Sequence, residues 1–131
     1  MGLIYLDSCL LIYVVENHPK LAPRIQAAMA KHPAETFAIS SLVTLKCLVK
    51  PLRGDDLGLL RRYDSSFAEM EILTLPESVY RDAARLRARF NLKTPDALHL
   101  ACAQYHGCAA LWTNDNRLTL AGHGLVINAL Q

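Results

Sequence analysis

The first residues of the chain constrain its fold more than any other stretch. Four apolar or aromatic residues, 3–6, run directly into the carboxylate of Asp7, and a second apolar run follows at residues 9–15. A short, uninterrupted apolar run is typical of a central strand in a parallel sheet, which helices cover on both faces. Because ligands collect at the carboxyl ends of such strands, Asp7 is predicted to lie where a functional site would form.

Strand and helix patterns alternate along the rest of the chain. Short apolar segments predict four further strands, at residues 36–39, 71–75, 109–113 and 125–127. Helical spacing of apolar side chains predicts helices at residues 8–15, 19–31, 41–50, 57–70, 76–90 and 94–106. We expect helix caps at Ser8, at Ser40 or Ser41, at Asp55 or Asp56 and at Thr94, a helix stop at Pro51, and a loop with a short turn at residues 114–120. The alternation predicts an α/β fold with a parallel sheet and right-handed crossovers.

Composition agrees with one compact domain over residues 1–131. Hydrophobic residues make up 52% of the chain and charged residues 20%, and no apolar run approaches the roughly 18 residues of a membrane span. We therefore expect a soluble protein without a secretory signal. Its four cysteines form no C-x-x-C pair, so buried free thiols and a cytoplasmic location are predicted. A net charge of +2 permits a nucleic-acid partner without establishing one.

Three aspartates are predicted to converge at one edge of the sheet. Asp7 ends a strand, Asp96 lies in the first turn of an apolar helix, and Asp115 closely follows the strand at 109–113. Each has a simpler explanation: Asp7 as a helix cap, Asp96 as a partner for the helix dipole, and Asp115 as a turn residue. Together, three like charges in one partly buried place repel unless a cation binds them. Oxygen ligands favour a hard cation, Mg²⁺ or Mn²⁺.

The chain resembles a known family through four segments in order along its length. They are Ile4-Tyr5-Leu6-Asp7-Ser8, Ile39-Ser40-Ser41-Leu42-Val43-Thr44-Leu45, Thr94-Pro95-Asp96-Ala97-Leu98-His99-Leu100-Ala101 and Trp112-Thr113-Asn114-Asp115. The set is similar to PIN-domain proteins of the VapC toxin kind, small bacterial ribonucleases paired with antitoxins. The resemblance implies a three-layer α/β/α sandwich with a four- to five-stranded parallel sheet in the order 3-2-1-4-5. In that order Asp7 and Asp115 end neighbouring strands.

The resemblance also implies a chemistry and partners. Asp7, Asp96 and Asp115 would hold Mg²⁺ or Mn²⁺ for metal-assisted hydrolysis of RNA phosphodiester bonds. Thr113 would orient a ligand or a water, unless it is an ordinary threonine at a strand end. His99 lies on the same helix face as Asp96, and we favour a hydrogen-bonded core histidine over a metal ligand. The implied partners are an RNA substrate, a cognate antitoxin and a second copy in a homodimer.

Lys46 departs from the family pattern. The family usually carries a glutamate at this point in the helix after the second strand. A lysine in place of a glutamate changes the local charge by two units. Each unit is worth about 4 kcal/mol against a divalent cation a few ångströms away, at an effective dielectric constant near 20. We favour an inward Lys46 that pairs with Asp7 and Asp96 over one that extends to solvent. The sequence thus predicts a ribonuclease impaired in this copy.

The sequence raises two other functions. A catalytically inert PIN-fold protein could still dimerise and bind an antitoxin, with Leu21, Leu59 and Leu60 forming a groove for a partner helix. A phospho-receiver domain is disfavoured, because residues 72–76 supply no aspartate at the end of the third strand. Some basic side chains could follow an RNA backbone, although a solvated helix face is the preferred explanation; they are Lys50, Arg53, Arg61 and Arg62.

Overall fold

The sheet is parallel and five-stranded, as the sequence and the resemblance predicted. A computed structural model of the chain describes residues 2–130, and its strands lie in the order β3-β2-β1-β4-β5. The strands are β1 Leu3–Leu6, β2 Thr36–Ser40, β3 Glu71–Leu73, β4 Ala110–Thr113 and β5 Val126–Asn128. In the central register Tyr5 lies between Ala38 of β2 and Leu111 of β4. The chain order reverses at β1, so the carboxyl ends of β1 and β4 flank the topological switch point.

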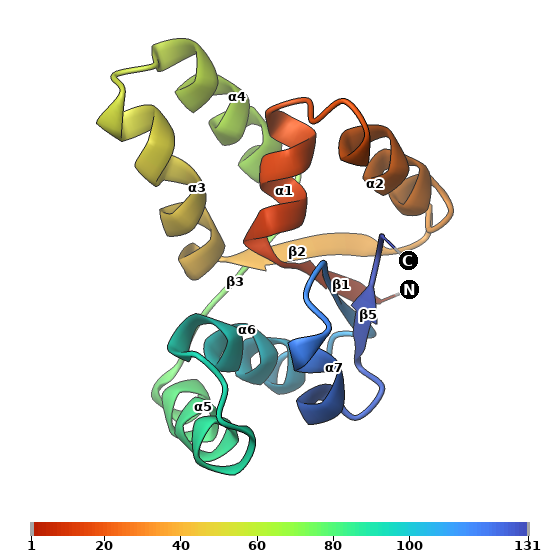
Figure 1. The fold of residues 1–131 in the computed structure, drawn as a ribbon, viewed down its shortest axis with the longest axis vertical. Helices are drawn as coiled ribbons and strands as arrows, with labels where there is room; N and C mark the ends of the chain where they lie inside the picture. Colours follow the sequence, from red (N-terminus) through yellow and green to blue (C-terminus); the bar gives the residue numbers. More distant parts are fainter. Residues whose placement is uncertain (1, 131) are drawn as a thin grey trace.

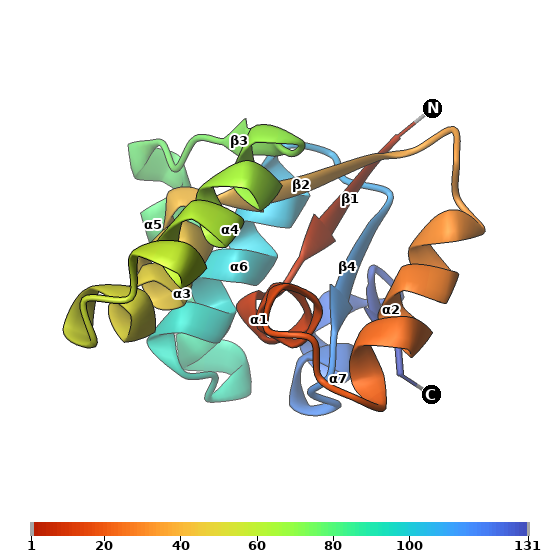
Figure 2. The same ribbon diagram turned by 90° about the horizontal axis from the view of Figure 1, so that it is seen from above.

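Among residues 2–130, seven helices cover the two faces of this sheet, which gives the predicted three layers. Figure 1 shows the first four helices on one face and the last three on the other. The helices are α1 Ser8–Val15, α2 Leu21–Ala30, α3 Ser41–Arg53, α4 Leu57–Ala68, α5 Glu77–Phe90, α6 Thr94–Tyr105 and α7 Arg117–Gly122. The view from above in Figure 2 shows β1 lying between β2 and β4 and leading directly into α1.

The core explains why β1 is almost wholly apolar. Ile4, Tyr5 and Leu6 are all buried, because helices cover both faces of the strand. On the face of α5 and α6 the core continues through Leu100 and Ala103, which are fully buried. This packing fixes the first turn of α6, and Asp96 with it, against the carboxyl end of the sheet.

Pro51 does not end α3, contrary to the prediction. The helix continues through it to Arg53, and the proline ring is buried. Proline removes its own backbone donor, so the helix loses one hydrogen bond at residue 51. It ends only two residues later, where the Gly54 amide donates to the Lys50 carbonyl at 3.1 Å. The loop predicted at residues 114–120 also differs, since its second half belongs to the short helix α7.

The predicted caps are partly correct. Asp56 caps α4 through its Oδ1 atom, which accepts a hydrogen bond from the Leu59 amide at 3.0 Å. Ser8 and Thr94 are instead the first helical residues of α1 and α6, preceded by Asp7 and Lys93 at the cap positions. Within residues 2–130, no helix combines the length and the apolar character that crossing a bilayer requires.

Candidate functional site

Asp7 lies at the carboxyl end of β1 and is 7% exposed. Its backbone amide donates to the Trp112 carbonyl at 2.9 Å, which continues the β1–β4 ladder up to the carboxylate. The Thr113 hydroxyl donates to Asp7 Oδ2 at 2.9 Å, and the Ser8 hydroxyl lies 3.3 Å from Oδ1. Two neighbouring strand ends therefore hold this carboxylate in a fixed orientation.

Thr113 connects Asp7 to the loop after β4. Its side chain is fully buried, and its oxygen also accepts a hydrogen bond from the Asp115 backbone amide at 3.1 Å. A hydroxyl can donate once and accept at the same time, so one side chain ties the two acidic residues together. The structure thus gives Thr113 a specific position in the site.

Asp115 lies at the same edge, but its carboxylate already has a partner. The Arg117 guanidinium donates to both oxygens, from Nε at 3.0 and 2.9 Å and from Nη2 at 2.6 Å. These hydrogen bonds hold the pKa of Asp115 below its usual value. The pairing with Arg117 was not predicted, because nothing in the sequence distinguishes this arginine from a solvated one.

Asp96 lies in the first turn of α6, half-buried and without a hydrogen-bonded partner among the described residues. Burial raises its pKa, and the negative charges of Asp7 and Asp115 raise it further. Lys46 and Arg117 act in the opposite direction. The negative charges of Asp7 and Asp115 therefore act on Asp96, as expected for three carboxylates near one edge of the sheet.

His99 lies one turn after Asp96 and is fully buried. Its Nδ1 atom is 2.7 Å from the Tyr5 hydroxyl, which is also 2.7 Å from the Ser40 hydroxyl. Its Nε2 atom is 3.6 Å from Asp7 Oδ1 and has no hydrogen-bond partner among the described residues. Burial lowers the pKa of His99, so the ring is neutral near pH 7. This is the hydrogen-bonded core histidine that the sequence favoured.

Sequence reasoning missed Tyr5 and Ser40, which complete this buried chain of polar groups. Ser40 precedes α3 without using its side chain as a cap, because its hydroxyl bonds Tyr5 instead. One signal was present in the sequence. Side chains two residues apart in a strand share a face, so a tyrosine two residues before Asp7 belongs on the same side of the sheet.

Lys46 is half-buried on α3 and forms no ion pair with any carboxylate of residues 2–130. The favoured direct pairing with Asp7 and Asp96 is therefore not formed in this structure. Its charge still reaches the site, because it lowers the pKa of Asp96 and of His99. Lys46 thus acts at a distance, as a positive charge beside the acidic edge.

A divalent cation does not fit these side chains in their present arrangement. Across the described part of the chain, no three histidine, cysteine, aspartate or glutamate side chains form a group that could hold a metal ion. Arg117 engages both oxygens of Asp115, and Lys46 adds a positive charge near Asp96. One carboxylate of the edge, Asp115, is therefore neutralised by the chain's own arginine, and the charge of Lys46 acts on a second, Asp96.

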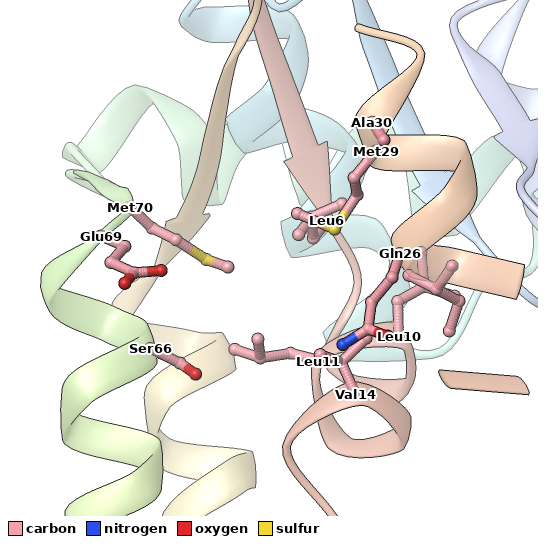
Figure 3. Close-up of a pocket in the computed structure, with 11 residues that line it drawn as sticks. Leu6, Leu10, Leu11, Val14, Gln26, Met29, Ala30, Ser66, Glu69 and Met70 are labelled. Atoms are coloured by element: carbon pink, nitrogen blue, oxygen red, sulfur yellow. The ribbon is translucent and has the colours of Figure 1, made fainter. Parts of the chain in front are cut away.

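A separate apolar hollow of about 390 Å³ lies on the other side of α1. Figure 3 shows Met29 of α2 and Met70, just after α4, facing it from opposite sides, with Leu11 of α1 between them. The predicted partner groove also lies on α2 and α4. Of its residues, Leu59 is buried in the core, which excludes it, and neither Leu21 nor Leu60 lines this hollow.

Comparison with known proteins gives a consistent fold. The family model described as PIN domain matches residues 4–123. A toxin–antitoxin complex from Klebsiella pneumoniae contains a chain with 22% identity and a TM-score of 0.79, and the match covers 96% of this chain and 97% of that one. A chain of VapBC2 from Rickettsia felis, solved bound to a promoter DNA fragment, has 18% identity and a TM-score of 0.78. That match covers 96% of this chain and 98% of the other. VapC20 from Mycobacterium tuberculosis, a toxin that cleaves the sarcin–ricin loop, has 13% identity and a TM-score of 0.73. That match covers 91% of this chain and 95% of the other. No curated protein sequence matches the chain.

Proposed function

The chain belongs to the PIN domain family, and from that membership we propose that it is the toxin component of a toxin–antitoxin pair. Its activity is a ribonuclease activity that depends on Mg²⁺ or Mn²⁺ and is impaired in this copy by Lys46. The substrate is single-stranded or structured RNA, and the reaction is hydrolysis of a phosphodiester bond. Asp7, Asp96 and Asp115 are the proposed metal ligands, and Thr113 orients two of them.

The observation that carries this proposal is the joint placement of Asp7, Thr113 and Asp115. The Thr113 hydroxyl donates to Asp7 and accepts from the Asp115 amide, at the switch point of a parallel sheet. A buried hydroxyl that aligns two acidic residues is more than a strand-end threonine needs. Burial raises the pKa of Asp96, and the charges of Asp7 and Asp115 raise it further. This effect of the two other carboxylates on Asp96 supports it as the third metal ligand.

The proposed impairment follows from the positive charges at this edge. The site has Lys46 where the family usually has a glutamate, and Arg117 already binds the carboxylate of Asp115. Such a site binds a dication weakly. In the present chain, the Thr113 hydroxyl still orients the Asp7 carboxylate and the Asp115 loop.

The variant Lys46→Glu tests the proposal. It restores an acid near Asp96, so isothermal titration with Mn²⁺ should show tighter binding than in the unchanged protein, and RNA cleavage should rise with metal. Lys31→Glu is the matched control, since it makes the same charge change at an exposed position just after α2, before β2 begins. If Lys46→Glu binds Mn²⁺ but leaves RNA intact, or if the unchanged protein cleaves RNA equally fast, the proposed impairment is wrong.

A second candidate function is binding without catalysis, and the hollow between α1, α2 and α4 favours it. Its lining is mainly apolar and includes Leu11, Val14 and Met29, which suits the apolar face of a partner helix. Two of the similar structures are toxin–antitoxin complexes, so we propose a cognate antitoxin as the partner. An absence of Mn²⁺ binding by both the unchanged protein and Lys46→Glu would favour this function over the ribonuclease.

Two further properties follow from the same proposal. We propose a cytoplasmic location, since the four cysteines are free and an RNA substrate is found there. We also propose a homodimer, which the family resemblance implies. Three exposed apolar side chains at helical spacing on α3, Leu45, Val49 and Leu52, form a surface that a second copy could cover. The mass in solution, measured by light scattering, decides the oligomeric state.

A further inference from the structure

A chain of buried polar groups ends at the Asp7 carboxylate without a completed hydrogen bond. It runs from Ser40 through Tyr5 to Nδ1 of His99, with both contacts at 2.7 Å. The other ring nitrogen, Nε2, is buried, lacks a partner among residues 2–130 and lies 3.6 Å from Asp7 Oδ1. Buried polar atoms without partners are uncommon, so this atom needs an explanation.

The two tautomers of a neutral imidazole arrange this chain in opposite directions. With the proton on Nε2, the Tyr5 hydroxyl donates to Nδ1 and the Ser40 hydroxyl donates to Tyr5. With the proton on Nδ1, the ring donates to Tyr5, and Tyr5 donates to Ser40. Both arrangements satisfy the two 2.7 Å contacts equally well. The choice is therefore made at the other nitrogen.

At Nε2 the two tautomers differ sharply. A proton on Nε2 places a positive dipole end toward the Asp7 carboxylate, in a largely buried site where such an interaction is stronger than in water. A proton on Nδ1 leaves a buried lone pair facing the carboxylate, where both groups are acceptors and repel. Hydrogen bonds of this kind are often long in resting structures and shorten in the working complex.

We propose that His99 is a positioning residue for Asp7. The ring proton lies on Nε2, the Tyr5 hydroxyl donates to Nδ1, and the Nε2–H group orients the carboxylate. Asp7 then receives donors from Ser8, Thr113 and His99. Hydrogen-bonding partners of this sort hold a functional carboxylate in one orientation. The inference rests on the proposed function for its relevance to catalysis, but its test needs neither metal nor RNA.

The test is ¹⁵N NMR of the histidine ring nitrogens in the resting protein near pH 7. His99 is assigned through its contacts with the Tyr5 ring, whose centroid is 5.5 Å away. We expect a pyridine-like Nδ1 and a protonated Nε2 whose hydrogen exchanges slowly. In Asp7→Leu the acceptor is gone and the side-chain volume is roughly kept, so the preference should be lost and the two nitrogen shifts should approach each other.

Asp115→Asn is the matched control. It removes one negative charge from the same edge, but Asp115 contacts Arg117 instead of His99, so the tautomer should not change. A proton on Nδ1 in the unchanged protein overturns the inference, as does a tautomer that Asp7→Leu leaves unaltered. Failure of the proposed function would look different: Lys46→Glu would neither bind Mn²⁺ nor cleave RNA, while the His99 tautomer would stay as expected.

Discussion

Removing the Tyr5 hydroxyl should destabilise the fold strongly, because that one group satisfies two buried partners. Tyr5→Phe leaves the Ser40 hydroxyl and His99 Nδ1 without their 2.7 Å contacts, and both side chains are fully buried. Each stranded polar group costs about 1–3 kcal/mol, so the expected loss in the free energy of unfolding for the two groups is about 2–6 kcal/mol. For a domain whose total stability is about 5–15 kcal/mol, this is a large fraction.

Urea denaturation, followed by circular dichroism, measures this loss, and Tyr63→Phe is the control. Tyr63 is equally buried, but its hydroxyl serves only Glu16, whose side chain is 21% exposed and keeps its ion pair with Lys50. That substitution should cost about 1 kcal/mol. With a urea m-value of about 1–3 kcal/mol/M, the two midpoints should be clearly separated. If Tyr5→Phe costs no more than Tyr63→Phe, the buried chain through His99 does not stabilise the fold as argued.

Two further substitutions test the packing and the charges elsewhere. Gly122→Ala should lower the free energy of unfolding by about 1–3 kcal/mol, because the new Cβ would lie 2.3 Å from Val126 Cγ2. Gly58→Ala in α4 is its control. The nearest atom to the new Cβ there is 3.6 Å away, so stability should stay unchanged or rise by up to about 1 kcal/mol. For Glu16, burial alone would raise the pKa, but the two hydrogen bonds that its carboxylate accepts lower it below 4.5. The stability that this lowered pKa contributes is present above pH 4.5 and is lost as the pH falls through the folded-state value. Thermal melts of Glu16→Gln should therefore show a deficit at pH 7 that disappears in acid, and a deficit independent of pH would contradict the assigned hydrogen bonds.

The sequence predicted the sheet and the acidic edge because both follow from local patterns. Short apolar runs separated by helical periods leave few parallel topologies, and a carboxylate directly after such a run must lie at the strand end. The prediction for Asp7 needed only its two neighbouring segments. The order of the strands came from the family resemblance, since local patterns do not determine which strands are neighbours.

The partners of the acidic residues could not be predicted in the same way. Tyr5 meets Ser40 and His99 across sequence separations of 35 and 94 residues, so no local pattern joins them. The position of Lys46 was clear from the sequence, but the direction of a long flexible side chain on a half-buried helix face was not. The same limit applies to Arg117, because α7 is too short for helical periodicity to reveal it.

The β1–β4 pairing also determines when the site can form during synthesis. Thr113 and Asp7 are 106 positions apart, so at about 5–20 residues per second a ribosome needs roughly 5–20 s to advance from one to the other. During that interval β1 lacks its β4 neighbour, and the Asp7 carboxylate lacks its principal donor. The nascent protein therefore has no assembled acidic edge, and this part of the molecule becomes complete only after Thr113 has been synthesised.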